Sequence, residues 1–313
     1  MTSPFPSPDR PLRIGTRGSA LALAQAREAR DRLMAAHSLP EGAFGITVIR
    51  TTGDRVTDRP LKELGGKGLF TREIEIALAE GEIDIAVHSM KDMPTQQPEG
   101  LVLDTALPRA DPRDAFVSPR HAGIDDLPEG AVVGTSSLRR RAQLLHRRPD
   151  LRVVEFRGNV QTRLGKLDDG VAEATFLAMA GLGRLDRADL ARAPVPPERM
   201  LPAIGQGAIT IERRADDDRA GALLAPLDHA ETTTRLTGER AFLARLDGSC
   251  ETPIGAMTAL SEGHLTLSGQ ILRPDGSEAH ADTVAGPAET AAAMGRELAD
   301  RLLSRAGPGF LET

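Results

Sequence analysis

LRIGTRGSALALAQAREARDRLMAAH (12–37) joins two patterns of different period, and the junction between them indicates the fold class. Residues 12–16 form a short apolar run that predicts a strand, and residues 19–37 have the apolar spacing of a helix. Ser19 is a plausible N-cap, because its hydroxyl can accept a hydrogen bond from a free N–H of the first turn. The alternation continues with a strand at 44–51, a helix at 70–81 that Gly81 ends, and a strand at 83–89. This βαβ pattern is typical of an α/β domain with a mostly parallel sheet.

The rest of the chain repeats this pattern once and then changes character. Prolines and charges at 107–114 and at 192–202 predict two linkers. Strands are predicted at 131–135, 151–156, 174–179 and 208–212, and helices at 136–148 and 159–169. Beyond about residue 229, the prediction is a helix at 231–246, strands at 254–260 and 264–272, and a helix at 289–306. The fold class is therefore α/β, with two such domains and a smaller α+β domain at the C-terminal end.

Composition excludes several classes of function. The net charge of −6 and the 3% aromatic content, with no Trp or Tyr, argue against binding to nucleic acid. No apolar run is long enough to cross a membrane, and MTSPFPSPDRP at the start has no apolar core of a secretory signal. We therefore expect a cytoplasmic protein. One Cys and 7 scattered His predict no metal site.

Positive charge gathers in one segment of this acidic protein. Nine basic residues lie between Ser136 and Lys166, opposed only by Asp150 and Glu155. They are Arg139, Arg140, Arg141, Arg147, Arg148, Arg152, Arg157, Arg163 and Lys166. A solvated helix face is the simple interpretation. However, the hydroxyls of 135–137 lie where a strand turns into a helix, and free N–H groups at such a turn favour an anion. Arginine also binds carboxylates in bidentate geometry, so a small polyanionic ligand is the alternative.

Two further segments carry reactive side chains. In HSMKDMP (88–94), Ser89, Lys91 and Asp92 follow an apolar strand, and ligands of open α/β sheets bind beyond the carboxyl ends of strands. Lys91 and Asp92 could form a plain surface ion pair, or Asp92 could stabilise a developing cation or move a proton. The only cysteine, Cys250, follows Gly248 and Ser249. It is either a packing residue or, on a loop near basic groups, a nucleophile or attachment point.

At these residues the sequence resembles the hydroxymethylbilane synthase (porphobilinogen deaminase) family, from about Leu12 to about residue 305. The matching segments, in order, are IGTRGSALALAQA (14–26), GGKGLFTREIE (65–75), DIAVHSMKDMP (84–94), DPRDAFVS (111–118), VGTSSLRRRAQL (133–144), FRGNVQTRLGKLD (156–168), AGLGRL (180–185), LPAIGQGAI (201–209) and GSCETPIGA (248–256). Nine matching segments in the family's order are not a coincidence.

The resemblance implies an activity and a cofactor. The family joins four porphobilinogen molecules head to tail, losing ammonia at each step, and water releases hydroxymethylbilane. A dipyrromethane cofactor, attached through a thioether to the residue matching Cys250, is the primer. Asp92 matches the catalytic aspartate. The residues matching cofactor ligands are Ser89, Lys91, Thr135, Ser137, Arg139 and Arg140, with Lys67 on a loop over the cleft. Those matching the substrate path are Arg17, Ser19, Arg157, Arg163, Arg184 and Gln206.

The resemblance also implies an arrangement of domains. Two α/β domains like those of periplasmic binding proteins are expected at 1–107 with 203–227 and at 112–200, and a third domain at 229–313. We expect a monomer. The segment 54–67 is charged and has few apolar residues, so we expect a mobile lid. Glu63 stands where many relatives have lysine, so loop contacts to the ligand are expected to differ. Glu173 stands at a position where relatives often have aspartate.

Two other functions compete with this interpretation. A non-catalytic protein that binds a small anion could share the two-domain architecture, because fold alone does not define function. Such a binder would have no use for Cys250. An RNA-binding interpretation of the basic segment is weaker, since both the aromatic content and the net charge oppose it.

Overall fold

A computed structural model describes residues 6–55, 68–248 and 252–311. The chain divides into two compact units. The first comprises Met1–Ala110 and Ala208–Thr233, and the second comprises Asp111–Gly207 and Thr234–Thr313. The three-domain boundaries predicted from the resemblance remain a prediction.

The first unit is built on a five-stranded sheet in the order β2-β1-β3-β10-β4. The strands are β1 (Leu12–Arg17), β2 (Phe44–Ile49), β3 (Ile85–Ser89), β4 (Leu101–Ala106) and β10 (Ile209–Arg214). Strand β1 runs parallel to β2 and β3, whereas β10 runs antiparallel to β3 and β4. The unit's helices are α1 (Ala20–His37), α2 (Thr52–Arg55), α4 (Arg72–Ala79) and α8 (Asp218–Leu224), and α9 (Ala230–Arg245) begins in it.

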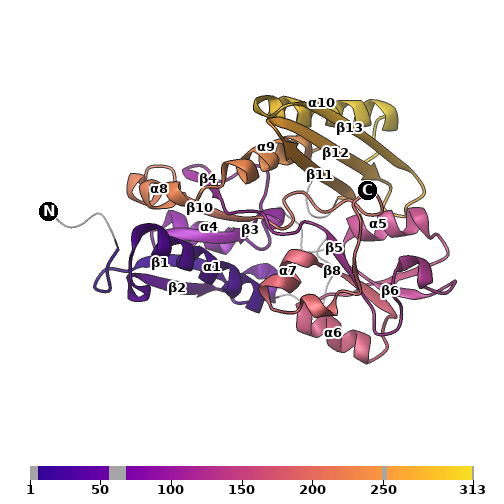
Figure 1. Ribbon diagram of the computed structural model, residues 1–313, viewed down its shortest axis with the longest axis horizontal. Helices are drawn as coiled ribbons and strands as arrows, with labels where there is room; N and C mark the ends of the chain where they lie inside the picture. Colours follow the sequence, from indigo (N-terminus) through magenta and orange to yellow (C-terminus); the bar gives the residue numbers. More distant parts are fainter. Residues whose placement is uncertain (1–5, 56–67, 249–251, 312–313) are drawn as a thin grey trace. The chain divides into compact units, whose positions relative to one another are not determined.

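Alternation along β3 explains why both faces of this sheet are covered. Ile85 and Val87 belong to the core that α1 closes, and Ala86 between them belongs to the core that α4 closes. Successive side chains of a strand point to opposite faces, so a strand buried on both faces becomes a continuous apolar run. Figure 1 shows α1 and α4 with the strands that they cover.

The predicted helix ends of this unit are confirmed. The Ser19 hydroxyl accepts a hydrogen bond from the N–H of Ala22 at 3.2 Å, and α1 follows immediately. Helix α4 ends before Gly81, whose φ of 75° is the left-handed conformation that glycine adopts without a steric cost.

The second unit contains a sheet with a similar plan, in the order β7-β6-β8-β5-β9. Its strands are β5 (Asp114–Val117), β6 (Val132–Gly134), β7 (Arg152–Val154), β8 (Ala174–Ala178) and β9 (Ala193–Pro194), and its helices are α5 (Leu138–Arg147), α6 (Val160–Asp168) and α7 (Met179–Arg184). Strand β5 is antiparallel to β8 and β9, as β10 is antiparallel to its neighbours. Strand β9 lies inside the predicted linker 192–202, so that prediction was wrong at this point. Its shortness and its proline fit an edge strand.

A three-stranded antiparallel sheet completes the second unit. It consists of β11 (Ile254–Ser261), β12 (His264–Leu272) and β13 (Ala279–Pro287), and α10 (Ala291–Ala306) lies along it, as Figure 1 shows. Strand β13 was not predicted. Its sequence, AHADTVAGP, buries only Val284, so it has little of the apolar alternation that identifies a strand.

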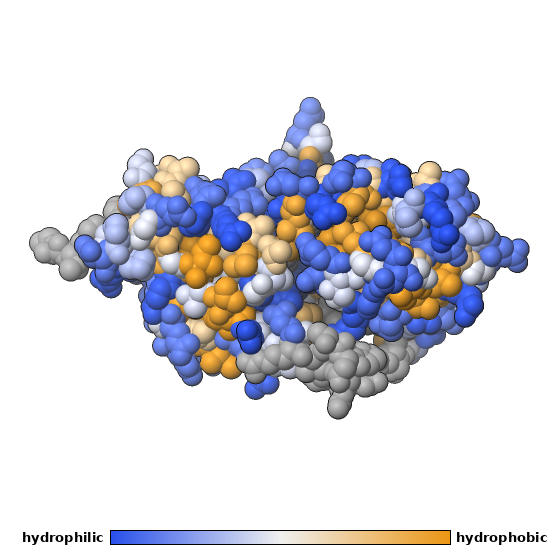
Figure 2. Space-filling model, turned by 90° about the horizontal axis from the view of Figure 1, so that it is seen from below, coloured by the Kyte–Doolittle hydropathy of each residue, from blue (hydrophilic) through white to orange (hydrophobic). Residues whose placement is uncertain are grey.

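The prediction of two α/β domains and a smaller α+β domain is confirmed by these three sheets. Short 3₁₀ turns occupy Glu41–Ala43, Met90–Asp92, Ile124–Asp126, Ala188–Leu190, Ala225–Leu227 and Ala288–Thr290. On the face seen in Figure 2, hydrophobic residues form separate patches bordered by hydrophilic ones. No helix in the described ranges is long and apolar enough to span a bilayer.

Candidate functional site

The carboxyl ends of two parallel strands bring the first group of predicted residues together. Strand β1 ends at Arg17, and its neighbour β3 ends at Ser89, directly before the 3₁₀ turn Met90–Asp92. The Arg17 Nη1 atom lies 3.7 Å from the Asp92 Oδ2 atom. The strand end is where an open α/β sheet binds its ligands. The sheet therefore places a carboxylate and a guanidinium side by side at this edge.

Arg17 has a closer partner that the sequence did not reveal. Its Nη2 and Nε atoms lie 2.5 Å and 3.2 Å from the two carboxylate oxygens of Asp54, and its guanidinium stacks 4.2 Å from the centre of the Phe70 ring. Asp54 comes from the one-turn helix α2, far from Arg17 in sequence. No local pattern separates Asp54 from other acidic residues, so only the fold identifies it.

Ser89 is held by a second residue that sequence reasoning missed. Its hydroxyl exchanges hydrogen bonds of 2.8 Å and 3.0 Å with the side-chain amide of Gln25. Gln25 is buried on α1 among Ala22, Ala26 and Ala29. A polar residue within the apolar stripe of a helix is a signal that could have found it, because buried polar groups need partners.

The hydroxyls at the β6–α5 turn lie as predicted at a helix N-terminus. Ser137 is the N-cap of α5, and its side chain accepts a hydrogen bond from the N–H of Arg140 at 3.4 Å. Thr135 accepts from the N–H of Ser137, and Ser136 accepts from that of Phe156. A hydroxyl that accepts a bond still has its own hydrogen to donate. A role in binding a carboxylate remains a prediction for Thr135 and Ser137.

Arg139 and Arg140 are buried around a single carboxylate. Asp114, the first residue of β5, lies 2.7 Å from the nearest guanidinium nitrogen of each. Arg139 also donates to the carbonyl of Leu201, and Arg140 to that of Phe176, each at 2.7 Å. Gln206, predicted on the substrate path, donates to Asp114 at 2.9 Å. The sequence suggested that the guanidinium groups of both arginines face a ligand. In the structure they bind Asp114 and backbone carbonyls of the protein itself.

The charges of this buried cluster do not balance. Burial alone would raise the pKa of Asp114, but Arg139 and Arg140 hold it far below the usual range. Burial lowers the pKa of Arg139, and Asp114 opposes that shift. Two guanidinium groups share one carboxylate, and the buried Nε of Arg139 has no hydrogen-bond partner among the described residues. The cluster therefore keeps a positive charge that an anionic ligand would balance.

The remaining predicted arginines of the second unit come from helix α6 (Arg163), from the end of helix α7 (Arg184) and from the segment before α6 (Arg157). Burial lowers the pKa of Arg163 to about 10, and the positive charge of Arg140 adds to that shift. The Arg163 Nε donates to the carbonyl of Gly158 at 2.9 Å, and Arg184 donates to that of Gly207 at 3.3 Å. Arg157 lies between β7 and α6. Arg163 therefore remains charged at neutral pH, and it lies close enough to Arg140 for the two positive charges to interact.

Several predicted residues lie outside the described part of the chain. These are Cys250, Lys67 and Glu63, together with most of the predicted lid, 54–67. Gly248 and Thr252 are the described neighbours on either side of Cys250. The roles of these residues remain predictions.

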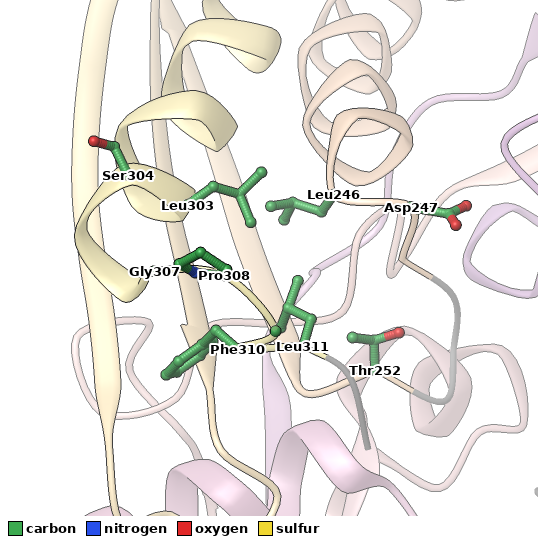
Figure 3. Close-up of a pocket in the computed structure, with 10 residues that line it drawn as sticks. Leu246, Asp247, Thr252, Leu303, Ser304, Gly307, Pro308, Phe310 and Leu311 are labelled. Atoms are coloured by element: carbon green, nitrogen blue, oxygen red, sulfur yellow. The ribbon is translucent and has the colours of Figure 1, made fainter.

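A cavity of about 660 Å³ lies in the α+β part of the second unit. In Figure 3, Leu246 and Leu303 point toward each other, while Asp247 points away. Among the described residues, its lining contains Asp247 but no lysine or arginine, and none of those predicted to bind carboxylates. The cavity does not suit a polyanion. Within 6–55, 68–248 and 252–311, no group of His, Cys, Asp and Glu could hold a metal ion.

Fold and site together define a protein with two α/β sheets of similar plan, a carboxylate beside an arginine at one strand edge, and a buried arginine pair with surplus positive charge. Residues 12–222 match the family described as "Porphobilinogen deaminase, dipyromethane cofactor binding domain", and residues 233–304 match "Porphobilinogen deaminase, C-terminal domain". The chain belongs to the porphobilinogen deaminase family. The predicted family, enzyme class and dipyrromethane cofactor are confirmed, and the alternative of a non-catalytic anion-binding protein is not supported.

Individual relatives agree with this assignment. The chain is 66% identical to a porphobilinogen deaminase of Paracoccus denitrificans, covering 98% of both chains. It is 53% identical to one of Nitrobacter hamburgensis, covering 95% of this chain and 94% of the relative.

Similarity to solved structures is more distant. The periplasmic VFT2 domain of Bordetella pertussis BvgS is 14% identical, with 74% of this chain and 92% of that chain covered and a TM-score of 0.41. A nutrient-binding protein of Burkholderia cenocepacia bound to methionine is 13% identical, with 71% and 93% covered and a TM-score of 0.42. These scores are too low to support a conclusion.

Proposed function

We propose that this chain condenses four porphobilinogen molecules head to tail, with loss of ammonia at each step, and releases hydroxymethylbilane by hydrolysis. The observation that carries the proposal is the position of Asp92 at the carboxyl end of β3, 3.7 Å from Arg17. The dipyrromethane group, attached to Cys250 through a thioether, supplies the free pyrrole carbon from which the product grows.

Asp92 is the proposed catalytic residue. When porphobilinogen loses ammonia, positive charge develops on its pyrrole nitrogen, and a fixed carboxylate nearby lowers the energy of that state. Asp92 is suited to this role because it is only partly exposed and is close to, but not in bidentate contact with, a guanidinium. The same carboxylate can accept and return a proton at the pyrrole N–H.

Carboxylates of substrate and cofactor are the proposed ligands of the basic residues. Porphobilinogen carries two carboxylates, and each addition brings two more, so the number of arginines matches the chemistry. The proposed substrate ligands are Arg17, Ser19, Arg157, Arg163, Arg184 and Gln206. The proposed cofactor ligands are Ser89, Lys91, Thr135, Ser137, Arg139, Arg140 and Lys67. The unpartnered Nε of Arg139 and the surplus charge around Asp114 fit an anionic cofactor.

A primer that stays attached also explains how one set of residues can serve every cycle. Each addition becomes intramolecular, which removes much of the entropy cost of bringing two reactants together. We propose that the enzyme works in the cytoplasm as a monomer, binds no nucleic acid, and is organised as the three predicted domains, 1–107 with 203–227, 112–200 and 229–313.

Intact mass spectrometry of the purified protein tests the proposal. The expected result is a mass above that of the polypeptide by two pyrrole units, which disappears in Cys250→Ser together with nearly all turnover of porphobilinogen. Because the sequence contains one cysteine, no other thiol can replace it. A Cys250→Ser protein that keeps the extra mass and full activity would overturn the attachment site. A protein that never turns over porphobilinogen would overturn the function itself.

A further inference from the structure

The guanidinium of Arg17 is held on an edge and on a face. Asp54 binds its Nε and Nη2 edge, at 3.2 Å and 2.5 Å, and the ring of Phe70 lies 4.2 Å from its central carbon. This side-on, bidentate pairing is the most directional contact between arginine and a carboxylate. It leaves Nη1 as the nitrogen that faces Asp92, at 3.7 Å. The direction of Nη1 is therefore set by Asp54.

Asp54 is itself fixed by the turn that carries it. The hydroxyl of Thr51 donates to Asp54 at 2.8 Å, and the N–H of Gly53 donates to the carbonyl of Leu69 at 2.9 Å. A side chain on Gly53 would place its Cβ 2.2 Å from the Phe70 ring. Only glycine lets the turn and the ring approach this closely. The carboxylate and the aromatic ring thus form one packed clamp around Arg17.

The clamp also determines which carboxylate neutralises the positive charge of Arg17. Burial alone would raise the pKa of Asp54, but the hydrogen bonds and charge of Arg17, with help from Thr51, hold it below its usual range. Asp54 is therefore ionised at neutral pH. Without that negative charge, Asp92 would be the nearest carboxylate to Arg17, and a charge-assisted hydrogen bond would draw the two together. Asp92 would then lose its freedom to face a substrate cation.

We propose that Asp54 is a positioning residue, which holds Arg17 so that Nη1 points beside Asp92 without forming a close ion pair with it. The inference rests on the proposed function, in which Asp92 faces the pyrrole nitrogen. A substrate carboxylate that binds Nη1 of Arg17 then has its ring next to Asp92. Asp54 acts on the reaction only through Arg17.

The same strand offers a matched control. Arg13, at the other end of β1, makes the same side-on pair with Asp84, at 3.1 Å from Nε and 2.7 Å from Nη2. Asp84 precedes β3 and has no role in the proposed chemistry. The substitutions Asp54→Asn and Asp84→Asn therefore each remove a carboxylate that pairs side-on with an arginine of this strand, and Asp84 in addition accepts the backbone N–H of Arg13 at 2.8 Å. A merely structural role predicts similar effects for both.

The experiment measures kcat, KM and melting temperature of both variants as holoenzymes, with the cofactor verified by intact mass. Removing a charge-assisted hydrogen bond that orients a reactant corresponds to about tenfold or more in kcat/KM. We expect that loss for Asp54→Asn, with a lower kcat, and a change within about twofold for Asp84→Asn, whose pair lies away from the site. Equal activities in the two variants would overturn the proposal. If Asp54→Asn does not fold, Thr51→Val, which removes one of its supports, must show a smaller loss in the same direction.

A double-mutant cycle tests whether the effect passes through Arg17. In an Arg17→Lys background, measured in single turnovers, Asp54→Asn should cause no further loss, because lysine lacks the bidentate fork that Asp54 orients. A loss that persists undiminished would contradict the inference. Asp92→Asn in parallel separates the two ideas. Normal turnover in that variant would remove the proposed role of Asp92, whereas a dead Asp92→Asn beside a normal Asp54→Asn would remove only the role of Asp54.

Discussion

One arginine between two carboxylates in the first unit contrasts with one carboxylate between two arginines in the second. Arg17, Asp54 and Asp92 have side chains that are 23%, 26% and 29% exposed. The side chains of Asp114, Arg139 and Arg140 are 0%, 5% and 7% exposed. The first group is open to solvent and carries a net charge of −1 when all three are ionised. The second is closed and carries +1.

The difference indicates that the two groups have different functions. A negative surplus beside a loosely paired Asp92 suits the stabilisation of a cation that forms during reaction. A buried excess of positive charge suits a ligand that carries several carboxylates, because the arginines are already desolvated in the folded protein before the ligand binds. We therefore expect substitutions in the second group to act first on stability and cofactor assembly, and substitutions in the first to act on turnover.

The largest expected effect on stability is that of Asp114→Asn. Removing one partner of a buried ion pair costs about 3–5 kcal/mol, because the remaining charges stay desolvated. Chemical unfolding should show this loss, and the variant should assemble little cofactor. Asp125→Asn is the control, because Asp125 pairs with Arg199 at the surface of the same unit. Its effect should be much smaller, and equal losses in the two variants would contradict the account.

A smaller effect is expected from Arg157→Leu, which is proposed to bind the growing product. Loss of one charge-assisted hydrogen bond costs about 1.5–3 kcal/mol, enough to stall elongation at a short oligomer without unfolding the protein. Native mass spectrometry after addition of porphobilinogen would show the stalled complexes. Elongation to completion at the normal rate would refute a role for Arg157.

The smallest expected effect is the acid sensitivity that Asp114 confers. Its pKa is lowered in the folded protein, so its contribution to stability is complete above the unfolded value of about 4 and is lost as the pH falls below it. By pH 3 the unfolded chain has gained a proton that the folded protein has not, which removes about 1 kcal/mol. Between pH 5 and pH 3 the free energy of unfolding of the wild type should therefore fall by about 1 kcal/mol more than that of Asp114→Asn. Parallel pH profiles would show that the fold does not lower the pKa of Asp114.

Local sequence pattern was sufficient for most of the fold. The run 12–37 gave both a strand and a helix because each period is visible within a few residues, and Ser19 marked the boundary between them. Strands β4, β5, β9 and β13 were not predicted. Strand β13 buries one large side chain, and β9 has two residues and a proline, so their pairing depends on neighbours distant in the sequence.

The candidate site shows the same limit. Motifs placed Asp92, Arg17 and the hydroxyls of the β6–α5 turn at strand ends, where the structure has them. Their partners could not be found in this way. No local sequence pattern distinguishes Asp114 and Asp54 from other aspartates such as Asp111 and Asp104. Their pairing with arginines arises only when strands and turns that are distant in the sequence come together in the fold. Because they pair with the buried Asp114, the guanidinium groups of Arg139 and Arg140 point into the protein.

Single-turnover kinetics of Asp92→Asn, with its melting temperature, tests the central claim most directly. Asparagine keeps the shape of the side chain and removes its charge. A positioned acid/base or electrostatic group contributes at least about 10²-fold in rate, so the account predicts a loss of that size, with an unchanged melting temperature and an intact cofactor mass. Asp92→Glu, which keeps the charge, should retain more activity. Near-normal turnover by an Asp92→Asn protein that merely melts earlier would contradict the account, because Asp92 would then be a structural partner of Arg17 and no part of the chemistry.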